Sequence, residues 1–154
     1  VVGIMMFQSV TMQESAMEPT YSVSEKFFVN RALYKVSSPK RGDVIVFKTS
    51  ASDSAALHIR RVIGLPGETV QVKDGKIYIN GKVYEENGAY QDMTDGGLAN
   101  SAITLESGEY FVLGDNRNNS EDSRFSDIGN ISKKYIVGKV WFTVSPKNKI
   151  GFIK

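Results

Sequence analysis

The residues of this chain that could perform chemistry include one histidine, His58, and two serines near acidic residues, Ser15 and Ser120. A serine beside a histidine and a carboxylate can act as a nucleophile, because the histidine takes the hydroxyl proton. Ser15 or Ser120 would have to lie next to His58 to form such a triad. The simpler interpretation is that His58 lies on a strand, either at the wall of a groove in the protein or at its surface. With no cysteine and one histidine, the sequence excludes thiolate and multi-histidine metal sites.

A polar segment, GDNRNNSEDSR at 114–124, concentrates acids, amides and arginines. One interpretation is a loop held by ion pairs. A calcium loop is another, but its spacing fails because Arg117 occupies the second ligand position. We therefore expect neither a metal nor another cofactor.

Length and composition are those of an ordinary globular protein. The chain has 154 residues, 41% of them hydrophobic and 23% charged, which suits a single domain over 1–154 with one core. A net charge of +2 gives no general attraction to nucleic acid, so no nucleic-acid partner is expected. Lys35, Lys40 and Arg41 form a small basic cluster, which we interpret as a solvated loop.

Short apolar runs dominate the pattern, which indicates strands rather than helices. DVIVF (43–47) and HIRRVIG (58–64) are typical of buried strands, and EYFVLG (109–114) and KVWFTV (139–144) are predicted as two further strands. Only 131–137 looks capable of a helical turn. The predicted fold class is mainly antiparallel β.

The segment 69–86 is predicted to be a three-stranded meander. TVQVK (69–73), KIYIN (76–80) and KVYEE (82–86) alternate in polarity. Asp74-Gly75 and Asn80-Gly81 lie between them, and such pairs are strong hairpin signals because both positions of the turn need positive φ.

Three other segments lack a clear pattern. Residues 48–57 are a polar loop of small residues, and 87–108, rich in Gly, Asn, Ser and Asp, are interpreted as a surface insertion. The apolar start, VVGIMMF at 1–7, is too short to span a bilayer. It is either a first strand or the outer end of a membrane anchor that lies upstream.

Three segments, in this order, resemble the hallmark boxes of the type I signal peptidase family: AMEPTY (16–21, the first box), IRRVIGLPGETVQV (59–72, the second box) and GDNRNNSEDSR (114–124, the third box). RGDVIVF (41–47), which lies between the first two boxes, also resembles the family. The ending GNISKKYIVGKVWFTVSP (129–146) is also similar, so the resemblance covers roughly 10–146. It implies two antiparallel sheets in a coiled, barrel-like body with few short helices.

The resemblance breaks at the two catalytic positions. The family uses a Ser-Lys dyad, in which the serine attacks the scissile carbonyl and a neutral, buried lysine takes its proton. Aligned without a gap, the nucleophile position is Ala16 and the general-base position is Arg60. Alanine has no nucleophile, and arginine is effectively always protonated. The chain should therefore not cleave peptides by the family mechanism.

The resemblance also assigns supporting residues. In the family the serine of the third box hydrogen-bonds the lysine, so Ser120 would face Arg60. The acids and arginines of the boxes form an ion-pair network, which here would comprise Asp115, Asp122, Arg61 and Arg124.

The neighbourhood of the lost dyad departs from the family as well. Glu14 stands where the family usually has glycine or serine, and Tyr21 where it usually has leucine. A carboxylate at Glu14 would repel a developing oxyanion, the reverse of what catalysis requires. Because Glu14 and Arg60 carry opposite charges and face one cleft, we predict an ion pair, direct or water-bridged, that closes the dyad space. These changes favour native substitutions over engineered ones.

In the family, an extended substrate adds as a strand between the first-box strand (about 9–16) and the second-box strand (about 57–60). The corresponding groove residues here are Val10, Met12, Glu14, Met17, Tyr21, His58 and Ile59. Two interpretations stay open. The apolar members wall a pocket for small side chains, or they pack the core and Tyr21 plugs the pocket.

Signal-peptidase-like proteins without the dyad occur in Gram-positive pilus gene clusters. The resemblance thus implies a pseudoenzyme that binds extended signal-peptide or pilin segments and assists pilin export and pilus assembly with the pilus machinery. It would sit at the outer face of the bacterial plasma membrane on a single-pass upstream anchor of about 20 residues. The alternatives are an authentic signal peptidase I, a serine endopeptidase cleaving after A-x-A sites, inactivated by engineered substitutions, and a scaffold module that uses its outer surface.

Overall fold

The computed structural model describes residues 7–50, 55–145 and 151–152. The apolar start at 1–6 and the centre of the 48–57 loop lie outside these ranges. Strands form two sheets, and every strand pair is antiparallel. The prediction of a mainly antiparallel β fold with two sheets is confirmed.

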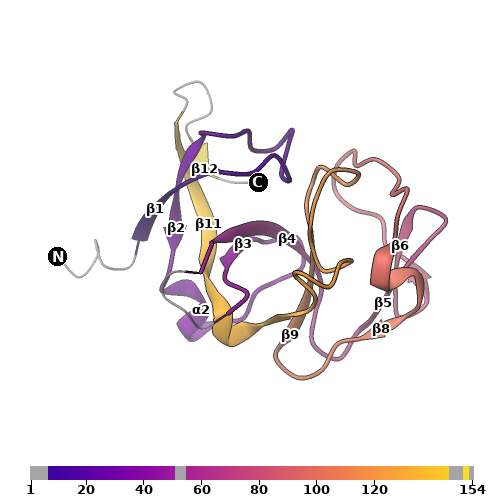
Figure 1. The fold of residues 1–154 in the computed structure, drawn as a ribbon. Coiled ribbons are helices and arrows are strands. Elements are labelled where there is room, and N and C mark those ends of the chain that lie inside the picture. The colour runs from indigo at the N-terminus through magenta and orange to yellow at the C-terminus, as the bar shows by residue number, and fades with distance from the viewer. Residues whose placement is uncertain (1–6, 51–54, 146–150, 153–154) are drawn as a thin grey trace.

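The larger sheet is strongly curled and combines strands from both ends of the chain (Figure 1). Its strands run in the order β1 (Phe7–Thr11), β2 (Lys26–Asn30), β11 (Ile136–Ser145), β3 (Val44–Phe47), β4 (His58–Gly64), β9 (Glu109–Leu113) and β10 (Ile131–Ser132), and β12 (Gly151–Phe152) pairs with β11. All four residues of β3 are buried. Val44 and Val46 belong to one hydrophobic cluster and Ile45 and Phe47 to another, so β3 has a core on each of its faces.

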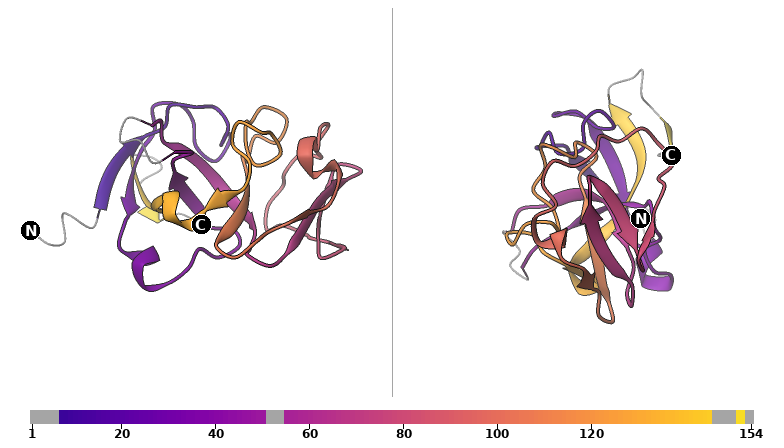
Figure 2. Two further views of the ribbon diagram at one scale, coloured as in Figure 1. Left: turned by 60° about the horizontal axis from the view of Figure 1, so that its bottom comes forward. Right: turned by 90° about the vertical axis from the view of Figure 1, so that its right-hand side faces the viewer.

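The smaller sheet lies beside the larger one (Figure 2). It is formed by β7 (Lys82–Val83), β6 (Lys76–Ile79), β5 (Thr69–Lys73) and β8 (Ile103–Thr104). The predicted meander is confirmed, although its last strand is only two residues long. Both hairpin pairs have positive φ, 52° and 78° for Asp74 and Gly75, and 52° and 81° for Asn80 and Gly81.

The segment 87–108 is mostly exposed but contributes to the second sheet. It contains β8 and a 3-10 helix, η1 (Gly97–Asn100). Met93, Ala99 and Leu105 are buried in a cluster with the apolar side chains of β5 and β6. The segment is thereby tied to the body of the protein.

The prediction of a single helical turn was wrong. The expected turn exists within 131–137 as η2 (Lys133–Tyr135), but η1 and the short α2 (Leu33–Val36) also form. Two backbone amides at the start of α2, those of Ala32 and Leu33, donate to Oδ1 of Asn30 at 3.0 and 3.1 Å. Such a side-chain acceptor stabilises a turn whose four residues are too few to show a helical period.

The first-box strand is shorter than expected. β1 ends at Thr11 rather than near residue 16. Met12 still exchanges backbone hydrogen bonds with Ser24 and Glu25, which precede β2. Between them the chain turns, and the amide of Tyr21 donates to the carbonyl of Met17 at 3.0 Å. Ala16 therefore lies in a turn rather than on a strand.

Gly138 on β11 packs directly against β2. A Cβ atom there would lie 2.8 Å from Val29 Cγ1 and would also overlap the backbone oxygen of Asn30. We expect Gly138→Ala to lower the free energy of unfolding by about 1–3 kcal/mol, as overpacking of a filled interior does. Urea denaturation measures this, with the exposed Ser9→Ala as control. An unchanged midpoint for Gly138→Ala would contradict the packing.

Candidate functional site at the seam of the larger sheet

The larger sheet leaves two strand edges unpaired near each other among the described residues. β1 pairs only with β2, and β9 begins its pairing with β4 at Arg61. β3 occupies the other edge of β4. Residues 58–60 of β4 therefore keep one edge free of strands. We call the region between this edge and β1 the seam.

Backbone directions show which peptide groups face the seam. Val62 exchanges hydrogen bonds of 2.8 Å with Gly42 and Asp43 on the β3 side. Because peptide groups alternate between the two edges of an antiparallel strand, those of Ile59 point into the seam. Met12 bonds toward β2 in the same way, so the peptide groups of Ser9 and Thr11 point outward from β1.

The predicted ion pair across the seam is confirmed. Nη2 of Arg60 donates to Oε2 of Glu14 at 2.7 Å. The side chain of Arg60 is only 1% exposed, whereas that of Glu14 is 35% exposed. A buried guanidinium needs such a counter-charge, because an unpaired charge away from water is strongly unfavourable.

The other nitrogens of the Arg60 guanidinium bond to backbone oxygens. Nε donates to the carbonyl of Glu121, and Nη1 to the carbonyl of Ile59, both at 2.7 Å. Every nitrogen of the group is thus engaged, and its position is fixed. The carbonyl of Ile59, which faces the seam, is already occupied by the side chain of the next residue.

His58 binds the second oxygen of the same carboxylate. Its Nδ1 lies 3.1 Å from Oε1 of Glu14. This hydrogen bond and the charge of Arg60 lower the pKa of Glu14 to about 2, against the opposing effect of burial. Glu14 is therefore a carboxylate across the physiological range of pH.

No serine joins this carboxylate and histidine in the described part of the chain. The hydroxyl oxygen of Ser15 accepts a 3.4 Å hydrogen bond from Asn119, and that of Ser120 donates to Asp122 at 2.9 Å. The arrangement thus supplies an acid and a histidine without a nucleophile. In the same residues there is no group of three or more side chains suited to hold a metal ion.

Ala16 is buried against the third-box segment. Its carbonyl accepts a 2.9 Å hydrogen bond from the amide of Asn116. Gly114 is in close contact with the Ala16 carbonyl and with the Ser120 hydroxyl, and a side chain there would overlap both. The positions carried over as nucleophile and supporting serine are thus brought together, while Arg60 reaches the carbonyl of the residue after Ser120.

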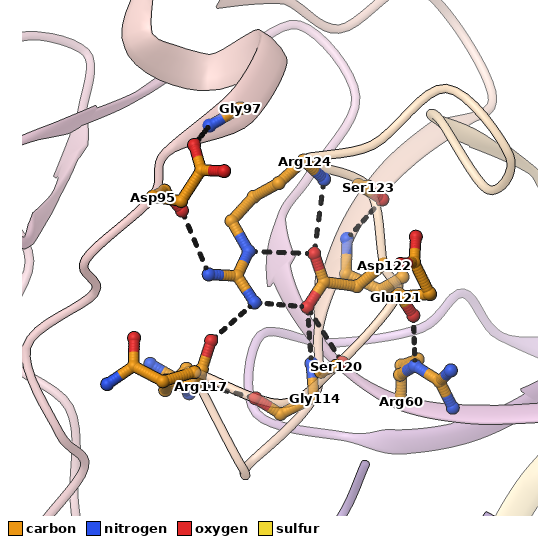
Figure 3. A network of polar contacts seen from close by, with 12 residues as sticks. Arg60, Asp95, Gly97, Gly114, Arg117, Ser120, Glu121, Asp122, Ser123 and Arg124 are labelled. Carbon is orange, nitrogen blue, oxygen red and sulfur yellow. Dashed lines mark hydrogen bonds and ion pairs between the residues drawn. The ribbon is translucent and has the colours of Figure 1, made fainter.

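Asp122 organises the third-box segment (Figure 3). Its carboxylate is fully buried and accepts from the Gly114 amide, the Ser120 hydroxyl, and the backbone and guanidinium of Arg124. Ser120 was expected to face Arg60, but its hydroxyl donates to Asp122 instead. Arg60 approaches the same loop from the other side, through Glu121.

Another buried ion pair joins the first and second boxes to the third box. Arg61 donates from Nε and Nη2 to the two oxygens of Asp115 at 2.8 and 2.7 Å, and from Nη1 to the carbonyl of Gly42. The hydroxyl of Thr20 also donates to Asp115, at 2.6 Å. The turn after β1, the approach to β3, β4 and the third box are held together at this point.

Sequence reasoning missed two partners of this frame. Glu86 forms a bidentate ion pair with Arg117, whose side chain is 1% exposed. The Arg117 guanidinium also lies 4.2 Å from the ring centre of Tyr90. Both partners come from the tail of the meander and from 87–108, where the pattern signals only a loop. The one signal in the sequence was Arg117 itself, because an arginine that becomes buried needs a carboxylate as partner.

The apolar groove residues pack as core. Val10, Met12, Met17 and Ile59 are 0–8% exposed and belong to one cluster. Tyr21 is 2% exposed and lies against Phe27, with ring centres 5.4 Å apart. Burial raises the pKa of its hydroxyl, which has no hydrogen-bond partner among the described residues. This supports the interpretation in which Tyr21 fills the pocket.

The fold and the site together define a mainly β protein whose curled sheet leaves a seam between β1 and the start of β4. The family described as "Signal peptidase, peptidase S26" matches residues 1–145. The chain belongs to this family.

Named relatives agree. The chain is 34% identical over 152 residues to signal peptidase I of Bacillus licheniformis, a match covering 94% of this chain and 80% of that protein. It is 32% identical over 148 residues to a probable signal peptidase I-2 of Synechocystis, which covers 90% of this chain but only 63% of the relative. The crystal structure of a signal peptidase I from Enterococcus faecalis is 32% identical, with a TM-score of 0.52, and covers 68% of this chain and 98% of that one.

Within the described ranges, no helix has the length and apolar character needed to cross a membrane. The upstream anchor stays a prediction.

The cost of removing the counter-charge of Arg60 is measurable. Glu14→Gln keeps the shape of the side chain but leaves the buried guanidinium without a carboxylate. Breaking a buried pair costs about 3–5 kcal/mol, and because Glu14 is partly exposed we expect about 1–3 kcal/mol. Urea denaturation measures the loss. Glu106→Gln, at an exposed position outside the described ion pairs, is the matched control, and equal midpoints for the two variants would contradict the role of Glu14.

At low pH, the free energies of unfolding of Glu14→Gln and of the parent protein should become equal. The folded-state pKa of Glu14 is lowered from 4.5 to about 2, so the unfolded chain binds more protons in that interval. The stability contributed by Glu14 is then complete above about pH 5 and is lost as pH falls toward 2. Denaturation curves of both proteins between these limits should converge on the acid side. A gap that stays constant would show that folding does not lower the pKa of Glu14.

Proposed function

We propose that this chain is a non-catalytic member of the signal peptidase family that binds extended peptide segments along the seam. The observation that carries the proposal is the Glu14–Arg60 ion pair, which holds a cation at the position that the family resemblance gives to the general base. A cleavage site requires a nucleophile and a neutral base there.

Neither Ala16 nor Arg60 has the chemistry that its position in the dyad requires. Ala16 presents a methyl group. Arg60 is held as a cation by Glu14 and by two carbonyls, and a guanidinium does not lose its proton in proteins. Glu14 also places a full negative charge at the site, which would oppose an oxyanion. Each feature alone argues against hydrolysis by a serine and a lysine.

Peptide binding, in contrast, needs only an unpaired strand edge. The outward peptide groups of Ser9 and Thr11 offer one edge of β1, which a peptide in extended form can extend. Because Tyr21 and its neighbours fill the core, we propose that main-chain hydrogen bonds rather than deep pockets provide the affinity. The preferred segments would then be extended, with small residues where the chain passes the seam.

The partner class is proposed from the family. Members act on signal-peptide-bearing precursors, and dyad-less relatives occur with pili, so we propose signal-peptide or pilin segments as ligands and a chaperone-like role in pilus assembly. The working location would be the outer face of the plasma membrane, with an anchor upstream. The membership of the chain in the family and the polar frame around Asp122 support this.

The alternative is an authentic signal peptidase I in which Ala16 and Arg60 are engineered substitutions. One observation favours this alternative, because the polar frame still brings Ala16 and Ser120 together at Gly114 and holds Arg60 against the next residue of the loop. The position of Glu14 argues against it, because the carboxylate is built into the site rather than merely near it.

Restoring the serine and the lysine distinguishes a non-catalytic protein from a disabled peptidase. The double variant Ala16→Ser/Arg60→Lys should not cleave a signal-peptide-bearing pilin precursor, because the Glu14 carboxylate would keep the introduced lysine protonated. Precursor and product are followed by electrophoresis and mass spectrometry beside the parent chain. The single variant Ala16→Ser is the matched control, since it adds a hydroxyl without a base. Robust cleavage by the double variant alone would contradict the proposal and identify a disabled peptidase.

A further inference from the structure

A cationic hollow lies outside the seam, between α2 and the start of β11. Its volume is about 420 Å³, within the range of small-molecule sites. Six residues of its lining matter here: Arg31, Lys35, Lys48, Lys133, Lys134 and Tyr135. They come from the turn after β2, from α2, from the end of β3 and from η2. Figure 1 shows α2 and the lower end of β11 close together.

Among the residues that the structure describes, five cations line this hollow and no acidic residue does. Arg31, Lys35, Lys48 and Lys134 take part in none of the ion pairs between described residues. Asp43, which binds the Tyr34 side chain of the lining, is itself paired: it accepts from the hydroxyl of Tyr34 at 2.7 Å and lies 3.4 Å from Nζ of Lys139. Like charges that converge without a counter-charge produce a strong local potential for anions.

Backbone contacts fix the elements that carry these cations. The amide of Lys48 donates to the carbonyl of Tyr135 at 3.0 Å, which joins the end of β3 to η2. Nζ of Lys133 donates to the Ser38 hydroxyl at 3.1 Å and to the Ser37 carbonyl at 3.4 Å, which joins η2 to the end of α2. The charges thus converge on a preformed hollow rather than being spread over a mobile surface.

We propose that this hollow binds a ligand with two or more phosphate groups. Ammonium groups act as point charges on phosphate oxygens, and the planar fork of Arg31 can engage two of them at once. One phosphate carries at most about two negative charges, so a single group would leave much of the positive field uncompensated. The ligand is either a soluble oligophosphate or the head groups of an anionic phospholipid surface.

The test uses two probes and two variants of equal charge. Sodium tripolyphosphate is titrated by calorimetry, and vesicles of phosphatidylglycerol are compared with vesicles of phosphatidylcholine by sedimentation. The hollow variant is Lys35→Gln/Lys48→Gln/Lys134→Gln. The control variant is Lys26→Gln/Lys73→Gln/Lys82→Gln, whose lysines are exposed and lie outside the hollow. Circular dichroism checks that both fold.

The proposal predicts that at least one probe binds the parent chain and that the hollow variant weakens it about tenfold or more, while the control changes it by less than about twofold. Tripolyphosphate binding identifies a soluble ligand, and binding only to phosphatidylglycerol vesicles identifies a lipid surface. Equal weakening by both variants would show mere net-charge attraction and overturn the proposal, as would failure of both probes to bind the parent.

Discussion

Burying the charge of Arg60 is the constraint on which the site depends. A guanidinium that is almost fully removed from water must have all of its donors satisfied and its charge balanced. Glu14 supplies the charge, and the carbonyls of Ile59 and Glu121 supply the remaining acceptors. These groups come from the first-box turn, β4 and the third-box loop. One side chain thereby links three segments far apart in the sequence.

The polar frame around the site is therefore explained without catalysis. Asp122 with Arg124, and Asp115 with Arg61, are buried pairs in which each carboxylate accepts several hydrogen bonds. Such networks fix a loop because each member would be costly to leave unsatisfied. Gly114 lets Ala16 and Ser120 approach closely. These contacts hold the turns of the chain against the sheet.

Much of this could be predicted from the sequence because it follows from local pattern or from opposite charges in known segments. The alternating runs and the Asp74-Gly75 and Asn80-Gly81 pairs predicted the meander, and Glu14 with Arg60 predicted the ion pair. The length of β1 and the helix α2 could not be predicted, since both depend on single hydrogen bonds such as those of Asn30. The hydroxyl of Ser120 donates to Asp122 because a carboxylate accepts its proton, whereas a guanidinium has only donors.

The central claim is that the seam accepts an extended peptide without cleaving it. Amide hydrogen exchange of Ser9 and Thr11, with and without a peptide of signal-peptide type, tests it most directly when the peptide mass is followed in the same sample. The account predicts slower exchange at both amides and an intact peptide, and loss of binding in Thr11→Pro, because proline removes the outward donor while an edge strand tolerates it. Unchanged exchange at Ser9 and Thr11 in a sample that binds the peptide, or a cleaved peptide, would contradict the account.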